Sequence, residues 1–228
     1  MTAAPALVLF DIDGTILRRA GPHHREALVE AVRRVAGIET TTSGIPLQGM
    51  LDTDILHLML QRAGIGSAQV RRWMPDLKWE AERYFVKVCP DLREKVCPGV
   101  RELLRDLRRQ KIPAGLVTGN LSRIAWKKME RSGLKMYFRF GAFSEQAPDR
   151  AGLVRRAIRH ARREGWISST SAITFIGDHE NDIRAAQASG IRSVAVATGL
   201  SSAEALASCG PDILVNDLRS LQLEMLIL

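Results

Sequence analysis

Apolar runs and segments of helical periodicity alternate along the chain from residue 98 to its end. The runs are short and bounded by turn residues, which is the pattern of strands buried in a sheet. Apolar positions three and four residues apart, between the runs, predict amphipathic helices. One further strand is predicted near the start of the chain. The predicted strands are residues 7–10, 112–117, 137–143, 172–176, 193–197 and 213–215, and the helices that alternate with them are residues 98–107, 122–132, 150–163, 180–189 and 202–208.

Residues 17–96 show a different pattern, with helical periodicity and no clear strand. Alternating strands and helices, as in the rest of the chain, favour a parallel sheet with helices on both of its faces. We therefore predict an α/β fold, in which a Rossmann-like parallel-sheet core at residues 1–16 and 97–228 carries an inserted all-helical domain at residues 17–96.

Polar residues follow three of the predicted strands at the point where each strand ends. Asp11, Thr118 and Asp178 each lie directly after an apolar run or within one residue of it. In open α/β sheets, ligands bind outside the carboxyl ends of the strands. The sequence therefore predicts that a hydroxyl and several carboxylates meet in one crevice.

Four carboxylates would share that crevice, from Asp11, Asp13, Asp178 and Asp182, with no lysine among them in the sequence. Clustered negative charges are unfavourable unless they are protonated or bridged by a cation. A hard divalent ion with oxygen ligands solves this, and Mg²⁺ is the usual one where phosphate is also bound. With such an ion present, an aspartate can attack phosphorus.

Three segments of the sequence resemble motifs of the haloacid dehalogenase superfamily. These segments are Asp11-Ile12-Asp13-Gly14-Thr15, Leu116-Val117-Thr118-Gly119-Asn120 and Gly177-Asp178-His179-Glu180-Asn181-Asp182. They occur in the order of the family's first, second and fourth motifs, and the resemblance covers essentially the whole chain. It implies a HAD-like core and, in the insertion, a helical cap of the C1 type.

The resemblance also implies a role for each matching residue. Asp11 would be the nucleophile, and Asp13 would act as acid and then as base. Mg²⁺ would be held by Asp11, the backbone carbonyl of Asp13 and Asp178, with support from Asp182. Thr118, Gly119 and Asn120 would bind the transferring phosphoryl group.

Two further predictions concern less regular positions. The family usually carries a lysine in its third motif, but residues 144–150 contain none, so Arg150 is the expected substitute for binding phosphate. Residues 49–53 resemble a cap loop that dips towards the active site. Gly49 and Asp52 are therefore candidates for substrate contact, although a loop and helix cap would explain them equally well.

Charge and composition exclude some classes of protein. The net charge of +8 should attract anions, but most of the basic pairs, Lys127-Lys128 among them, fall on predicted helices, where solvated faces explain them. Aromatic residues make up 5% and do not interleave with the charges, which disfavours nucleic acid as a partner. The three cysteines have no metal-ligand spacing and their odd count disfavours a disulfide framework, so a reducing cytoplasm is expected. No segment approaches the roughly 20 apolar residues of a membrane span.

The leading prediction is a Mg²⁺-dependent phosphatase that hydrolyses a small phosphorylated metabolite through an aspartyl-phosphate, similar to phosphoglycolate phosphatases. A sugar phosphomutase of the β-phosphoglucomutase type shares the aspartate pair and the cap, and stays open as an alternative. A nucleic-acid-associated binding protein on the same fold is an alternative of a different class. The sequence does not indicate the oligomeric state.

Overall fold

A six-stranded parallel sheet forms the centre of the computed structural model, which describes residues 3–18 and 21–227. Its strand order is β3-β2-β1-β4-β5-β6, so the first strand of the chain lies in the middle. The strands are β1 (Ala4–Phe10), β2 (Ala114–Val117), β3 (Phe138–Ala142), β4 (Ile167–Gly177), β5 (Arg192–Val196) and β6 (Ile213–Val215).

Helices cover both faces of this sheet because side chains alternate along its strands. Val8 and Phe10 of β1 pack into the core beneath α4 (Val100–Arg109) and α5 (Ser122–Arg131). Leu7 and Leu9 point the other way and pack with α6 (Arg150–Arg163) and α7 (Glu180–Gln187). The remaining helices of the core are α8 (Ala203–Ser208) and α9 (Glu224–Ile227), and four 3-10 turns lie at η1 (Arg93–Lys95), η2 (Lys135–Tyr137), η3 (Ser144–Gln146) and η4 (Leu218–Ser220).

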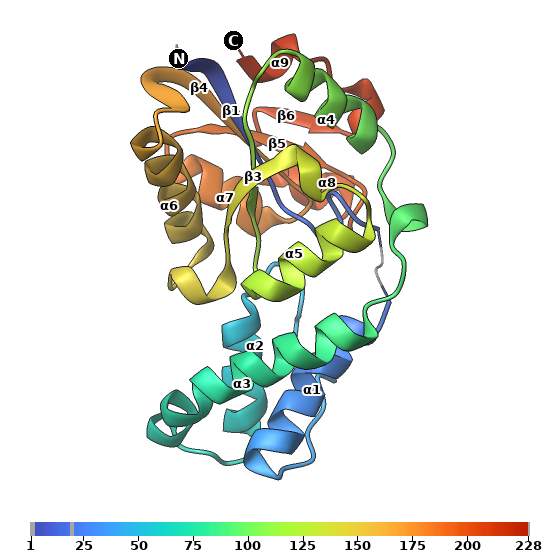
Figure 1. Cartoon of the computed structure of the whole chain (residues 1–228), viewed down its shortest axis with the longest axis vertical. Coiled ribbons are helices and arrows are strands. Elements are labelled where there is room, and N and C mark those ends of the chain that lie inside the picture. Colours follow the sequence, from blue (N-terminus) through green and yellow to red (C-terminus); the bar gives the residue numbers. More distant parts are fainter. Residues whose placement is uncertain (1–2, 19–20, 228) are drawn as a thin grey trace.

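The insertion after β1 forms three helices that lie apart from the sheet, at the side where α5 and the loop before α6 are found (Figure 1). They are α1 (His23–Ala36), α2 (Asp52–Arg62) and α3 (Ser67–Val88). The predicted fold class is confirmed: a parallel α/β sheet with an inserted helical cap. The domain limits at residues 16 and 97 stay a prediction.

Several elements differ from the prediction at their ends. Helix α3 begins at Ser67 and runs through Pro75, whereas the pattern predicted a start near residue 74. Val70, Leu77 and Ala81 are buried along one face of it, and this packing outweighs the backbone hydrogen bond that a proline cannot donate. Strand β4 begins at Ile167, five residues before the predicted start, because Ile167 already pairs with Ala4 at the beginning of β1.

Strand register determines which residues meet at the carboxyl edge of the sheet. Phe10 is paired with Leu116 on one side and with Ile176 on the other. The residues that follow these strands, Asp11, Thr118 and Asp178, are thereby brought to one edge. Within the described residues, no helix is long and apolar enough to cross a membrane.

Candidate active site

Three buried carboxylates converge at this edge. Asp11 follows β1, Asp178 follows β4, and Asp182 lies in the first turn of α7. Each offers one oxygen atom, and these atoms all lie within 4.8 Å of one another. The three residues are 5%, 7% and 2% exposed, so water screens their mutual repulsion poorly.

A tight turn after β1 lets Asp178 approach the backbone of the first motif. Gly14 has φ 91°, a conformation that favours glycine. A Cβ atom at Gly14 would also lie 2.0 Å from Oδ2 of Asp178, so a side chain there would collide with the carboxylate. The hydroxyl of Thr15 donates a hydrogen bond of 3.0 Å to Oδ1 of Asp178 and fixes its orientation.

Burial and like charge raise the pKa values of the three carboxyls. Burial raises the pKa of Asp11 to about 6, with Arg150 acting in the opposite direction and Asp182 and Asp13 adding to the rise. Burial, then Asp11 and Asp182, raise the pKa of Asp178 well above its ordinary value. The pKa of Asp182 is raised as well, again mainly by burial. Three carboxylates facing one guanidinium leave two negative charges, so these oxygen ligands fit a hard divalent cation.

Arg150 supplies the positive charge in this cluster. It is the first residue of α6, and Asp149 caps the helix by accepting a hydrogen bond from the amide of Gly152. Nη1 of Arg150 lies 3.0 Å from Oδ1 of Asp11, and its Nε lies 3.4 Å from Oδ1 of Asp182. The side chain is 8% exposed. The structure thus places Arg150 beside the expected nucleophile, where the family's third-motif lysine would be needed.

The second motif contributes two side chains to the same region. Thr118 is fully buried, and its Oγ1 accepts a hydrogen bond of 3.1 Å from Nδ2 of Asn120. The same amide group donates to Oδ2 of Asp13 at 2.9 Å. Gly119 lies between them beneath the cap, and a Cβ atom there would lie 2.1 Å from the carbonyl oxygen of Met50. The cap loop and the second motif are therefore in close contact at Gly119.

Lys128 is a site residue that the sequence analysis missed. Its Nζ atom lies 2.7 and 2.6 Å from the two carboxylate oxygens of Asp13, 2.7 Å from Oδ1 of Asn120 and 3.1 Å from Nδ1 of His24. Two expectations are therefore wrong for Lys128. It does neutralise a carboxylate of the site, and it is fully buried, whereas the pair Lys127-Lys128 was expected on a solvated face. A signal was present in the sequence, because Lys128 falls on the apolar stripe of α5 with Ile124, Ala125 and Met129.

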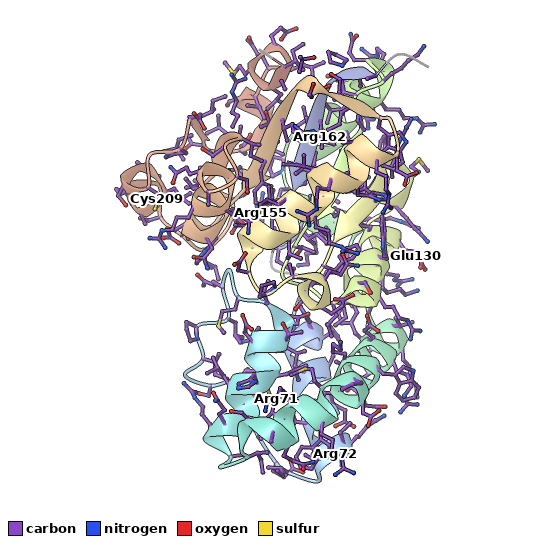
Figure 2. The ribbon with its side chains drawn as sticks, turned by 90° about the vertical axis from the view of Figure 1, so that its left-hand side faces the viewer. Arg71, Arg72, Glu130, Arg155, Arg162 and Cys209 are labelled. Carbon is purple, nitrogen blue, oxygen red and sulfur yellow. The ribbon has the colours of Figure 1, made fainter. Side chains whose placement is uncertain are left out.

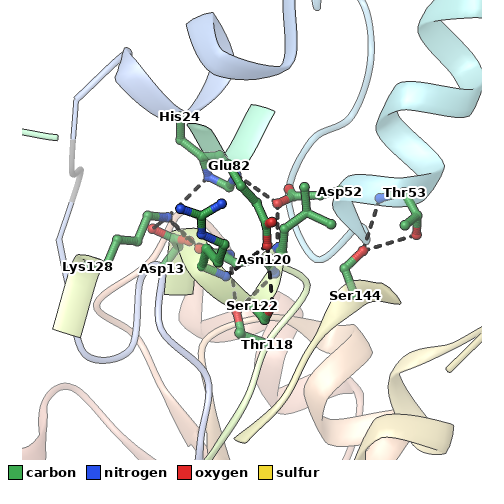
Figure 3. A network of polar contacts seen from close by, with 12 residues as sticks. Asp13, His24, Asp52, Thr53, Glu82, Thr118, Asn120, Ser122, Lys128 and Ser144 are labelled. Atoms are coloured by element: carbon green, nitrogen blue, oxygen red, sulfur yellow. Dashed lines mark hydrogen bonds and ion pairs between the residues drawn. The ribbon is translucent and has the colours of Figure 1, made fainter. Parts of the chain in front are cut away.

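His24 and Asp52 extend this contact into the cap, as Figure 3 shows. A protonated lysine offers only donors, so Nδ1 of His24 accepts from Lys128 and its Nε2 carries the hydrogen that is donated to Asp52. The Nε2 to Oδ2 distance is 2.9 Å. The same Oδ2 atom accepts a hydrogen bond of 2.8 Å from the amide of Leu121. We call Asp13, His24, Asp52, Asn120 and Lys128 the cap–core network.

The two expected substrate-contact residues of the cap both touch the core. Asp52 is 2% exposed, and its carboxylate is occupied by the two donors just described. The carbonyl oxygen of Gly49 accepts a hydrogen bond of 3.0 Å from Nδ2 of Asn181. In this arrangement both residues join the cap to the core, which favours the structural interpretation of the loop over direct contact with a ligand.

Comparison with known proteins agrees with the fold and the carboxylate cluster. The family model of haloacid dehalogenase-like hydrolases matches residues 5–190. The chain therefore belongs to the haloacid dehalogenase-like hydrolases. Among curated relatives, phosphoglycolate phosphatase 1 of Pseudomonas aeruginosa is 27% identical over 230 residues, covering 96% of this chain and 79% of the relative. The phosphoglycolate phosphatase of Synechococcus elongatus is 29% identical over 158 residues, covering 69% of each protein.

Solved structures share the fold at lower identity. CbbY from Rhodobacter sphaeroides, solved in complex with phosphate, has a TM-score of 0.72 and 19% identity, with both chains fully covered. A β-phosphoglucomutase from Clostridium difficile has a TM-score of 0.70 and 21% identity, covering 99% of this chain and 95% of that one. These likenesses establish the arrangement of core and cap.

Proposed function

We propose that this hydrolase is a Mg²⁺-dependent phosphatase that hydrolyses a small phosphomonoester through an aspartyl-phosphate on Asp11. The observation that carries the proposal is the pairing of two carboxylates with different surroundings, two residues apart. Asp11 lies with Asp178, Asp182 and Arg150, whereas Asp13 is held by Lys128 and Asn120. A nucleophile and a proton carrier need such separate environments.

The metal site would use the acidic cluster. Asp11, the backbone carbonyl of Asp13 and Asp178 would hold Mg²⁺, and Asp182 would support them. The bound ion supplies positive charge that stabilises the transferring phosphoryl group. Arg150 would add a second positive charge on the same side, and its guanidinium can bind two phosphoryl oxygens at once.

In the first step, an oxygen of Asp11 attacks phosphorus and the bond from phosphorus to the alcohol oxygen breaks. Asp13 gives its proton to the departing alcohol. In the second step Asp13 takes a proton from water, and the water oxygen displaces Asp11 to release phosphate. Thr118 and the amides of Gly119 and Asn120 would hold the phosphoryl oxygens, as groups ahead of a helix N-terminus can.

Lys128 positions Asp13 for these proton transfers. Partial burial would raise the pKa of Asp13, but the ammonium of Lys128, together with the hydrogen bonds from Lys128 and Asn120, outweighs this effect and holds the pKa below its ordinary value. Asp13 is thus in the base form that the second step needs. A bound phosphoryl group adds negative charge nearby, and this favours the proton that the first step needs. The side chain of Asp13 is 42% exposed, so it is held by Lys128 on one side while it can reach a ligand on the other.

The test is release of inorganic phosphate from a panel of phosphomonoesters, with Mg²⁺ and with EDTA. 2-Phosphoglycolate is the first ester to try, because the relatives that span most of the chain are named for it. We expect Mg²⁺-dependent release that is lost in Asp11→Asn. Release that persists in EDTA or in this variant would refute the mechanism. Conversion of glucose 1-phosphate to an isomeric sugar phosphate, without free phosphate, would instead indicate the mutase.

A further inference from the structure

A basic cavity lies on the flank of the core, away from the active site. Its volume is about 510 Å³, and it lies between α6, the first half of β4 and the turn from α7 to β5. The strand residues that line it fall between Ser169 and Thr174 and precede Asp178 by four to nine positions. At about 3.3 Å per residue, this places the cavity roughly 13–30 Å from the acidic cluster, at the amino end of the sheet. We call it the α6 cavity.

Four arginines line the α6 cavity, and no aspartate or glutamate is found among the described residues of its wall. These arginines are Arg155, Arg159, Arg162 and Arg192. The first three are spaced by four and three residues along α6, so they share one face of the helix. Figure 2 shows Arg155 and Arg162 on this helix, on the side of the molecule that faces the viewer. Like charges at such spacing repel each other unless a counter-charge lies between them.

Other basic helices of this protein carry their own counter-charges. Glu30 of α1 pairs with Arg33 and Arg34, and on α4 Glu102 and Asp106 pair with Arg105 and Arg109. Helix α6 contains no acidic residue in its 14 positions. In the described part of the chain, Arg159 and Arg162 form no ion pair, and the carboxylate nearest to Arg155 is that of Asp149 at 3.9 Å. The row of Arg155, Arg159 and Arg162 on α6 can therefore bind an anion from outside the chain.

One of the four arginines is held in place by the chain itself. Arg192, across the turn from Ser189, is anchored through Nη1 to the carbonyl oxygen of Met225 at 2.8 Å. Its guanidinium is thus held in place before any ligand binds.

We propose that the α6 cavity binds an oligophosphate chain, either inorganic triphosphate or the phosphate tail of a nucleoside triphosphate. Guanidinium groups form bidentate hydrogen bonds with phosphate oxygens, and four of them match the charge of three linked phosphates. The described wall contains no Trp, Tyr or Phe, so it lacks the stacking surface that a nucleic acid base would use. The ligand is recognised by its phosphates.

The proposal is tested by calorimetric titration of inorganic triphosphate into the full chain, in EDTA and about 150 mM salt, where weak surface attraction is screened. We expect saturable binding of one ligand per chain. Arg159→Gln with Arg162→Gln should weaken it by about tenfold or more, since charge-assisted hydrogen bonds are lost. The matched control is Arg71→Gln with Arg72→Gln, which removes the same charge from two exposed residues of the cap (Figure 2). The control should bind as the wild type does.

Each other outcome overturns the proposal. Equal weakening in both double variants would mean general attraction by net charge. Binding that survives Arg159→Gln with Arg162→Gln would place the ligand outside the α6 cavity. ATP should bind like triphosphate, and AMP much more weakly; equal binding of AMP would refute recognition of the phosphate chain. Tighter binding of short single-stranded RNA than of triphosphate, lost in the α6 variant, would assign the cavity to nucleic acid instead.

Discussion

Nζ of Lys128 contacts both carboxylate oxygens of Asp13, at 2.7 and 2.6 Å, although the two residues are 115 positions apart. This pair joins the first motif of the family to a helix that follows the second. The same ammonium reaches His24 of the cap. The carboxylate of Asp13, which should transfer protons in the reaction, is therefore oriented by the core and the cap together.

Lys128→Met should lower kcat by about 10²-fold while changing KM much less, because Asp13 loses the group that orients it. Methionine is close in length to lysine and suits a buried site, so folding should be preserved. The matched control is Lys127→Met, which changes the neighbouring residue that pairs with Glu130 on the outer face of the helix. Removing the ammonium also raises the pKa of Asp13, which acts as an acid in the first step, so the alkaline limb of kcat/KM should move to higher pH. An unmoved limb would contradict the role given to Lys128.

Asp11→Asn should change the pH dependence of stability in metal-free protein. Because the pKa of Asp11 is raised to about 6 in the folded chain, its contribution to stability is present at low pH and is lost as the pH rises through about 6. The loss is on the order of 3 kcal/mol. Asparagine carries no charge, so the Tm of the variant relative to the wild type should rise between pH 5 and pH 7.5 in EDTA. A difference that does not change with pH would show that Asp11 keeps its ordinary pKa.

Magnesium should stabilise the wild type and leave Asp178→Asn much less affected. A cation that binds only the folded protein raises its Tm, and it also relieves the repulsion among Asp11, Asp178 and Asp182. Thermal melts with increasing Mg²⁺ would measure this. Ca²⁺ at the same concentrations is a useful comparison, since it accepts looser geometry. Equal shifts in the wild type and the variant would place the ion elsewhere.

Arg150→Ala should reduce kcat/KM by about 10²-fold, since the guanidinium beside Asp11 is lost and a buried charge cluster is left with less compensation. Arg150→Lys should recover part of this activity, because a lysine restores the charge without the two-pronged geometry. Arg156→Ala, on an exposed position of the same helix, is the control. Steady-state kinetics on the best ester measure all three. Wild-type activity in Arg150→Ala would remove this residue from the site.

Asp52→Ala and His24→Ala should not have additive effects, since Asp52 acts on Asp13 through His24 and Lys128. Each single change should lower kcat, and the double variant should be little worse than either alone. A double-mutant cycle on kcat and KM tests this. Additive effects, with Asp52→Ala acting on KM alone, would revive direct contact between Asp52 and the substrate.

The sequence by itself determined the fold class and the carboxyl edge of the sheet. Apolar runs that end in Asp11, Thr118 and Asp178 are local features, and parallel pairing brings such ends together in any sheet of this kind. The role of Arg150 could be predicted only through the resemblance to the family's third motif, because residues 144–150 contain no lysine and Arg150 is the expected substitute.

Only the tertiary structure decided how Asp13 is held and which groups Gly49 and Asp52 contact. Lys128 looks like one half of a solvated basic pair until α5 is packed with its apolar stripe inward, which buries the lysine and aims its amine at Asp13. His24 and Asp52 belong to the insertion, and their contacts depend on where the cap lies against α5. The spacing of residues in the sequence describes one helix or strand at a time. Whether a charged side chain is buried depends on how two such elements pack against each other.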